Sequence, residues 1–330
     1  MRRVTLRQRR APSGESTTTV VVALAANLGI AIAKLAAALI SGSSAMLAEA
    51  FHAMADTGNE VILLVAQRQS ALPPDEDHPL GHGRAAYFWA LIAALGVFVT
   101  GALLSIREGI LELVHPSEST SFLVAYIVLA ISLILESVSL FRAYQQLRKE
   151  ATDLQRDFRE HLRLSSDPIA RAVLAEDSAA VVGNLIAGAG IGLRQLTGSS
   201  MPDGLAALLI GLILGYVAFE LARRNGDFLI GRRAPRNVEA DIRKVITGIP
   251  GVRGIAELLV IFIGPRQVRV LARVDIEDAL GGAQVKALIA QIEDALIKSS
   301  PYIVRVDIVP DGRRPQAQEK EPQPVPIPGQ

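Results

Sequence analysis

Six apolar stretches, each long enough to cross a lipid bilayer as a helix, constrain this 330-residue chain more than any other feature. A spanning helix needs about 20 residues, because the hydrocarbon core is roughly 30 Å thick. Half of the chain is hydrophobic and only 20% is charged, which is less charge than a soluble domain carries. We therefore expect an all-α bundle of six transmembrane helices over residues 17–233, with spans near 17–40, 44–67, 86–111, 121–141, 169–193 and 203–222.

The distribution of Lys and Arg orients these helices in the bilayer. The links after the first, third and fifth spans are nearly free of basic residues, whereas the links after the second, fourth and sixth are richer in them. Basic segments resist translocation, so the basic side is expected to face the cytoplasm. Both termini, including the arginine-rich residues 1–16, are then cytoplasmic. The start lacks a transit-type pattern, which favours a bacterial cytoplasmic membrane.

A soluble pattern begins after residue 233. Residues 234–310 show helical and strand periodicity in the order α-β-β-α-β, which predicts a small cytoplasmic α/β domain with helices on one face of a sheet. Residues 311–330 are rich in Pro and Gln, as disordered tails are. The basic residues are dispersed, so no nucleic-acid partner is expected. The chain has no cysteine, which excludes disulfides, thiolate metal sites and thiol catalysis.

The second span carries ionisable residues inside an otherwise apolar segment: Glu49, His52, Asp56 and Glu60. An ionised residue at mid-bilayer costs about 2.5–3.5 kcal/mol, so these residues must face a protein interior or a water-filled cavity. His52 and Asp56 share one helix face, with Glu49 on nearly the same stripe. Imidazole and carboxylate both suit zinc and related ions. The alternative is that these groups only hydrogen-bond between helices.

The fifth span holds a second acidic pair, Glu176 and Asp177. Adjacent residues lie about 100° apart on a helix, so both cannot point equally well into one site. We interpret Asp177 as a metal ligand and Glu176 as its neighbour, either a proton carrier or a partner for a basic group. The alternative is a structural pair bonded to Lys34 or to another helix. Asn27, in the first span, is expected to hydrogen-bond between helices.

The loop after the second span, PPDEDHPLGHGR, contains Asp75, His78 and His82. Their spacing is that of ligands to a second, more exposed metal ion. The prolines and glycines of the segment favour a loop, which must bend for three side chains to converge on one ion. The alternative interpretation is a solvated acidic linker.

The segments AEAFHAMADTGNE and DEDHPLGHGRAAYFWALI resemble the cation diffusion facilitator family, and so does the layout of six spans before a small cytoplasmic domain. The resemblance runs from about Ser16 to Pro310. It implies a homodimeric antiporter, and not an enzyme, that moves zinc, manganese, iron or cobalt out of the cytoplasm in exchange for protons. No histidine follows residue 234, so the C-terminal domain is expected to dimerise rather than to sense metal.

The resemblance also implies a tetrahedral transport site with two ligands from the second span and two from the fifth. Carried over, three of these ligands are His52, Asp56 and Asp177. The fourth position, four residues before Asp177, is Val173, which has no ligand atom. This departure leaves the fourth place to Glu176, Asn184, Glu49 or water. The adjacent Glu-Asp pair resembles a divergent branch of the family.

Two other functions compete with transport. A non-transporting metal-binding or regulatory membrane subunit is favoured only by Val173. An intramembrane metalloenzyme would need an HExxH-like pairing, a nucleophile motif or a cofactor-binding loop, and the sequence shows none of these. The physiological metal and the coupling stoichiometry are left open by the residues.

Overall fold

The computed structural model describes most of the chain, namely residues 17–117, 121–153 and 157–311. These residues form two compact units, the first extending to Arg232 with Gly264–Arg266 added, and the second comprising the remainder from Arg233. The basic N-terminus 1–16 and all but the first residue of the predicted tail 311–330 lie outside the described residues.

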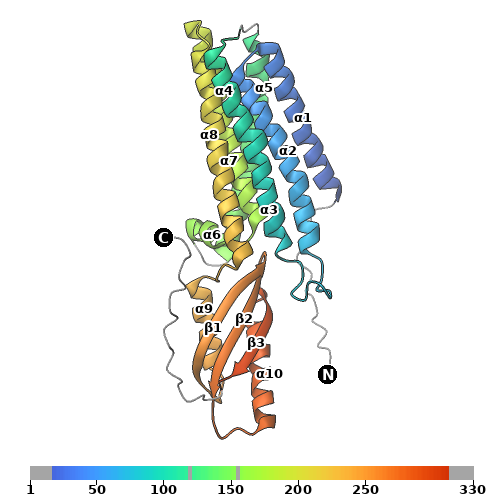
Figure 1. Cartoon of the computed structure of the whole chain (residues 1–330), viewed down its shortest axis with the longest axis vertical. Helices are drawn as coiled ribbons and strands as arrows, with labels where there is room; N and C mark the ends of the chain where they lie inside the picture. The colour runs from blue at the N-terminus through green and yellow to red at the C-terminus, as the bar shows by residue number, and fades with distance from the viewer. Residues whose placement is uncertain (1–16, 118–120, 154–156, 312–330) are drawn as a thin grey trace, which may run out of the picture. The chain divides into compact units, whose positions relative to one another are not determined.

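Long helices build the first unit, and Figure 1 shows them lying side by side. They are α1 (Thr17–Ser41), α2 (Ser44–Ser70), α3 (Ala85–Gly96), α4 (Leu104–Val114), α5 (Phe122–Asp153), α7 (Pro168–Thr197) and α8 (Met201–Ile230). A π-helix, η1 (Val97–Leu103), joins α3 to α4, so the third predicted span is one continuous helix. The short α6 (Phe158–Leu164) lies between α5 and α7 in sequence.

Two helices continue past the ends that apolarity predicts. The predicted fourth and sixth spans stop near residues 141 and 222, whereas α5 and α8 run to Asp153 and Ile230. A helix satisfies its own backbone hydrogen bonds, so it continues with polar residues where the apolar stretch ends. Apolarity marks the part of a helix that suits lipid, and not the end of the helix.

Five helical segments of the described chain are long and apolar enough to cross a membrane: Leu24–Ser41, Ala85–Val114, Phe122–Thr152, Pro168–Thr197 and Met201–Ile230. The predicted second span, α2, is as long as these but is not among them. Its charged residues Glu49, Asp56, Glu60 and Arg68 lower its apolar character. The protein is therefore a multi-pass membrane protein with five clear spans among its described residues.

Small residues let the helices of the bundle pack closely. Ala45, Ala48, Ala102 and Ala207 are fully buried in one core cluster. Gly109 of α4 touches α8 so closely that a Cβ atom there would lie 2.7 Å from the backbone nitrogen of a leucine on α8. Close backbone approach of this kind is typical of membrane helices, whose association depends on van der Waals packing.

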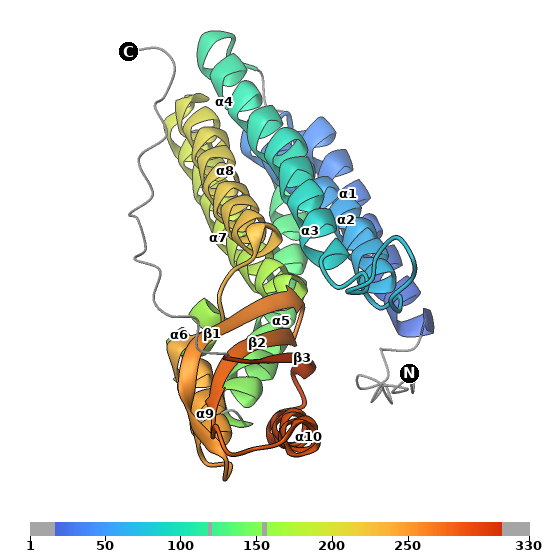
Figure 2. The same ribbon diagram turned by 60° about the horizontal axis from the view of Figure 1, so that its bottom comes forward.

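The second unit is a small α/β fold, with elements α9 (Arg236–Thr247), β1 (Val252–Gly264), β2 (Gln267–Ile276), α10 (Gly282–Ser299) and β3 (Ile303–Pro310). The three strands form one sheet in the order β1-β2-β3, and β3 runs parallel to β2 after the crossover through α10. Figure 2 shows the two helices against this sheet. The core is aliphatic, with Ile246 and Ile292 from the helices and Val260 and Val270 from the strands fully buried.

Candidate metal centre

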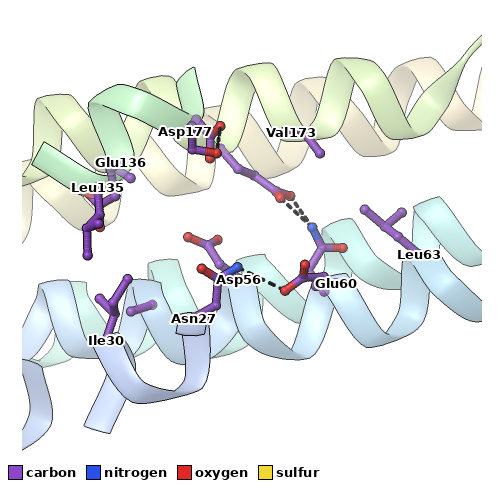
Figure 3. Close-up of a pocket in the computed structure, with 14 residues that line it drawn as sticks. Asn27, Ile30, Asp56, Glu60, Leu63, Leu135, Glu136, Val173 and Asp177 are labelled. Atoms are coloured by element: carbon purple, nitrogen blue, oxygen red, sulfur yellow. Dashed lines mark hydrogen bonds between the residues drawn. The ribbon is translucent and has the colours of Figure 1, made fainter. Parts of the chain in front are cut away.

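An acidic cavity of about 190 Å³ lies inside the bundle, lined by residues of α1, α2, α5 and α7. Liquid water takes roughly 30 Å³ per molecule, so the cavity has room for a metal ion with a few waters. Figure 3 shows the side chains around it. Five carboxylates contribute to the lining: Asp56, Glu60, Glu136, Glu176 and Asp177.

Helix α2 supplies the first group of polar side chains. Ser43 caps this helix, and its side chain accepts a hydrogen bond from the Met46 amide. Two turns further on, His52 Nε2 lies 3.1 Å from Asp56 Oδ2, as the four-residue spacing predicts. The His52 ring is 1% exposed, and its Nδ1 has no hydrogen-bond partner among the described residues. A buried imidazole nitrogen without a partner is unfavourable, and a cation would satisfy it.

Helix α7 supplies the second group. Asp167 caps it, with Pro168 in the first turn, and Glu176 and Asp177 both line the cavity. Glu176 accepts hydrogen bonds from Asn59 Nδ2 at 2.6 and 2.5 Å, and Asp177 accepts one from Ser139 Oγ at 2.8 Å. The adjacent side chains of Glu176 and Asp177 therefore both border the same cavity.

Val173 also lines the cavity, one turn before Asp177. Its position is the one expected from the four-residue spacing, but its side chain offers no lone pair. Glu60, at another edge of the cavity, accepts a hydrogen bond from Asn27 Nδ2 at 3.0 Å, so the predicted interhelical hydrogen bond of Asn27 is confirmed.

A buried ion-pair layer adjoins the cavity. Lys34 Nζ lies 2.7 Å from Glu49 Oε2 and 2.7 Å from Glu136 Oε1. The Asn184 amide donates to the other oxygen of Glu136. Gly183 of α7 leaves space for Glu49, because a Cβ atom there would overlap Glu49 Oε1. Glu136 belongs to both the layer and the cavity lining, so the layer meets the cavity at this residue.

This layer changes the environment of two residues singled out in the sequence. Glu49, a predicted ligand, is paired with Lys34. Like His52, it is not among the residues that line the cavity. The alternative of a structural acidic pair on α7 is wrong for Lys34, whose partners come from α2 and α5. Its other form, bonding to another helix, is observed, because Asn59 of α2 and Ser139 of α5 hold these two carboxylates. Sequence reasoning also missed Glu136, although a lone carboxylate in an apolar span was a usable signal, and it missed Asn59 and Ser139.

The loop after α2 brings Asp75, His78 and His82 together. One ligand atom of each lies within 4.8 Å of the others. His78 Nδ1 is 3.3 Å from Asp75 Oδ1, and His82 Nε2 is 3.5 Å from Asp75 Oδ2. The segment is a loop, with Gly81 at a positive φ of 80° where the chain bends. The His78 backbone N–H hydrogen-bonds Asp75 at 2.6 Å and holds the pKa of that carboxyl below its usual value.

The helical bundle and its acidic cavity define a multi-pass membrane protein with a polar site inside the membrane region. The family model for the cation efflux transmembrane domain matches residues 20–230. The chain therefore belongs to the cation efflux family, also called the cation diffusion facilitators.

Three relatives illustrate how much of the chain resembles known proteins. The chain is 36% identical over 258 residues to a proton-coupled zinc antiporter, SLC30A9, of Xenopus laevis, covering 78% of this chain and 46% of the relative. It is 31% identical over 235 residues to metal tolerance protein C4 of Arabidopsis thaliana, covering 71% and 51%. It is 27% identical over 282 residues to the cation-efflux pump FieF of Klebsiella pneumoniae, covering 85% and 88%. The chain spans about half the length of the first two.

Proposed function

We propose that this protein exports a divalent metal ion, with zinc as the first choice, from the cytoplasm in exchange for protons. The observation that carries the proposal is the meeting of Asp56 from α2 with Glu176 and Asp177 from α7 around one cavity, with His52 in contact with Asp56. Five carboxylates line this space and one ammonium adjoins it, so the cavity attracts cations. The names of the zinc antiporter and efflux relatives support the same activity.

The ligand set that we propose is His52, Asp56, Asp177 and Glu176. Zinc takes four ligands in a tetrahedron, and Glu176 takes the place that Val173 cannot fill. In the present arrangement the Glu176 carboxylate accepts a hydrogen bond from the Asn59 amide. To bind a metal ion, this carboxylate must give up that hydrogen bond and coordinate the ion instead. Three oxygen ligands and one nitrogen ligand form a harder set than two oxygens and two nitrogens. A harder set of this kind admits iron, cobalt or manganese beside zinc.

Proton coupling follows from competition for the same lone pairs. Metal binding requires carboxylates and imidazole without protons, and binding of protons releases the metal. Carboxylates in close proximity repel each other when ionised, and either a divalent cation or protons relieve this repulsion. The site is then loaded on the cytoplasmic side and protonated on the other.

Alternating access requires a barrier that changes sides. We propose that the Lys34–Glu49–Glu136 layer is the barrier in this arrangement, because it is buried and meets the cavity at Glu136. A fixed ammonium group opposes the passage of a divalent cation by Coulomb repulsion. Export then requires that the carboxylates of the layer part from Lys34.

The wider assembly is proposed on the same basis. Helix α2 is the sixth span, since its charged side chains face the cavity and the ion-pair layer rather than lipid. Residues 17–233 form the membrane domain, and residues 234–310 form a cytoplasmic domain through which two copies dimerise. A bacterial cytoplasmic membrane is proposed, with both termini inside. The SLC30A9 relatives are named as mitochondrial, whereas FieF is from a bacterium.

We further propose that Asp75, His78 and His82 bind a second metal ion at the surface. The spacing of their ligand atoms within 4.8 Å supports it. Asp75 is exposed, and the hydrogen bond from the His78 backbone lowers the pKa of its carboxyl below the usual value.

Transport by proteoliposomes tests the main proposal. Asp56→Asn removes a charge at nearly constant volume, and we expect it to abolish zinc-dependent proton flux while folding is retained. Glu108→Gln, in α4 and outside the cavity lining, is the matched control and is expected to transport normally. Zinc flux by Asp56→Asn at the wild-type rate would overturn the proposal. Metal binding without flux in the wild type would identify a non-transporting subunit instead.

A further inference from the structure

The start of α3, the start of α7 and the end of α8 lie at one end of the bundle (Figures 1 and 2). Three arginines belong to these segments. Arg84 is the N-cap of α3, Arg171 lies near the start of α7, and Arg232 follows the C-cap of α8. The guanidinium carbons of Arg171 and Arg232 lie 5.2 and 5.1 Å from the centre of the Phe228 ring. A Cβ atom on Gly231 would lie 3.7 Å from Arg84 Nη2, which places the third guanidinium beside the residue that precedes Arg232.

An aromatic platform supports this cluster. Tyr87 stacks on Phe228 with ring centres 4.9 Å apart and an interplanar angle of 14°, and both rings are buried. A guanidinium over an aromatic ring gains a cation–π attraction. This attraction lowers the energy of each cation, but it does not cancel the repulsion between like charges. The cluster therefore carries an excess of positive charge.

The described residues give the cluster no carboxylate in ion-pairing distance. Arg171 is only 4% exposed, and its Nε donates a hydrogen bond to the backbone oxygen of Asp167 at 3.3 Å. Its Nη1 is buried with no hydrogen-bond partner in the described part of the chain, and the same holds for Nε of Arg84. The Asp167 side chain caps α7, where it accepts hydrogen bonds from Ile169 and Ala170. Buried cationic donors without an acceptor are costly, so this site needs an anion.

Neighbouring arginines behave differently. Arg223 and Arg224, on the last turns of α8, both bond to the Glu220 carboxylate. The arginines near the end of α8 are thus neutralised where a carboxylate lies close to them. Arginines without a carboxylate partner are a feature of the Arg84, Arg171 and Arg232 cluster and not of the whole end of α8.

We infer that the site formed by Arg84, Arg171 and Arg232 binds a phosphate group, supplied by an anionic phospholipid of the adjacent leaflet. Guanidinium forks match phosphate oxygens in geometry and charge. Basic pockets between membrane helices on the cytoplasmic side bind anionic headgroups. Arg84 and Arg232 are partly exposed, so the site reaches the surface. The basic links at this end match the cytoplasmic leaflet.

Lipid binding by the purified full-length protein tests this inference. In an uncharged detergent, native mass spectrometry follows titration with phosphatidylglycerol, with phosphatidylcholine, or with inorganic phosphate. We expect one phosphatidylglycerol to be retained where phosphatidylcholine is not. Arg232→Gln, at the partly exposed edge, should weaken its retention about tenfold, the loss expected for one charge-assisted hydrogen bond. Arg223→Gln, outside the cluster, should leave it unchanged.

The outcomes separate the sources of the phosphate group. Displacement of phosphatidylglycerol by millimolar inorganic phosphate would show that the site binds phosphate but would overturn the assignment of that phosphate to a lipid. Equal retention of both lipids, or wild-type retention by Arg232→Gln, would overturn the site itself. Weaker self-association of Arg232→Gln without any phosphate binding would also overturn it, since the anion would then be a carboxylate of a second copy.

Discussion

Removal of the Lys34 ammonium tests the charge balance beside the metal cavity. Lys34 and Glu49 are 1% and 0% exposed, and Lys34 Nζ lies 2.7 Å from an oxygen of each of Glu49 and Glu136. Loss of one partner of a buried ion pair costs about 3–5 kcal/mol, because the remaining charge is left uncompensated. We expect Lys34→Met to lower the unfolding free energy by this amount, since Met nearly preserves the volume and removes only the charge.

The matched variant is Lys34→Met combined with Glu49→Gln and Glu136→Gln. Without carboxylates to leave unpaired, this triple variant should lose much less stability than the single one, because replacement of a whole buried ion pair is often close to neutral. Titration with SDS in mixed micelles, followed by circular dichroism, measures both. Equal losses by the single and triple variants would refute the reasoning, because Lys34 would then contribute packing and not charge.

Further outcomes follow from individual positions. Val173→His restores a nitrogen ligand at the cavity, so zinc binding measured by calorimetry should tighten relative to manganese. Gly183→Ala overlaps Glu49 and should cost about 1–3 kcal/mol, whereas Gly188→Ala, with open space around it, should cost nothing measurable. Burial raises the pKa of Glu293, so this group favours the fold in acid and loses that contribution as pH rises through the raised pKa. Glu293→Gln should therefore raise the melting temperature at about pH 7 but not below about pH 4.

Much of the fold could be predicted because a membrane makes local rules decisive. Five of the predicted spans recur as apolar helices, since each must satisfy its backbone internally. The one predicted span that does not qualify on apolarity is α2, and its shortfall comes from its charged residues, including Asp56 and Glu60. The pairing of His52 with Asp56 also follows from the helical period alone. These inferences needed only distances along one helix.

The remaining features depend on which helices are neighbours. Lys34 could pair with any acidic span, and its choice of Glu49 and Glu136 follows from the packing of α1 against α2 and α5. Asn59 and Ser139 hold the carboxylates of α7, yet each is an ordinary polar residue in the sequence. Helical angles alone could not show that two adjacent side chains border one cavity, because the position of the cavity is set by all four helices around it.

The departure at Val173 becomes intelligible once the cavity is seen with its hydrogen bonds. Val173 and Asp177 lie one turn apart on α7, whereas Glu176 reaches the same space from an adjacent position with a longer side chain. Asn59 holds Glu176 through both carboxylate oxygens, so the fourth candidate ligand is already oriented by the helix that carries His52 and Asp56. In the proposed site, metal arrival would exchange this neutral hydrogen bond for a bond to a cation, at the contact between α2 and α7. Because Glu176 is held by α2, its use as a ligand would couple occupancy of the site to the packing of α2 against α7. A fourth ligand at position 173, without such a contact to α2, would not provide this coupling.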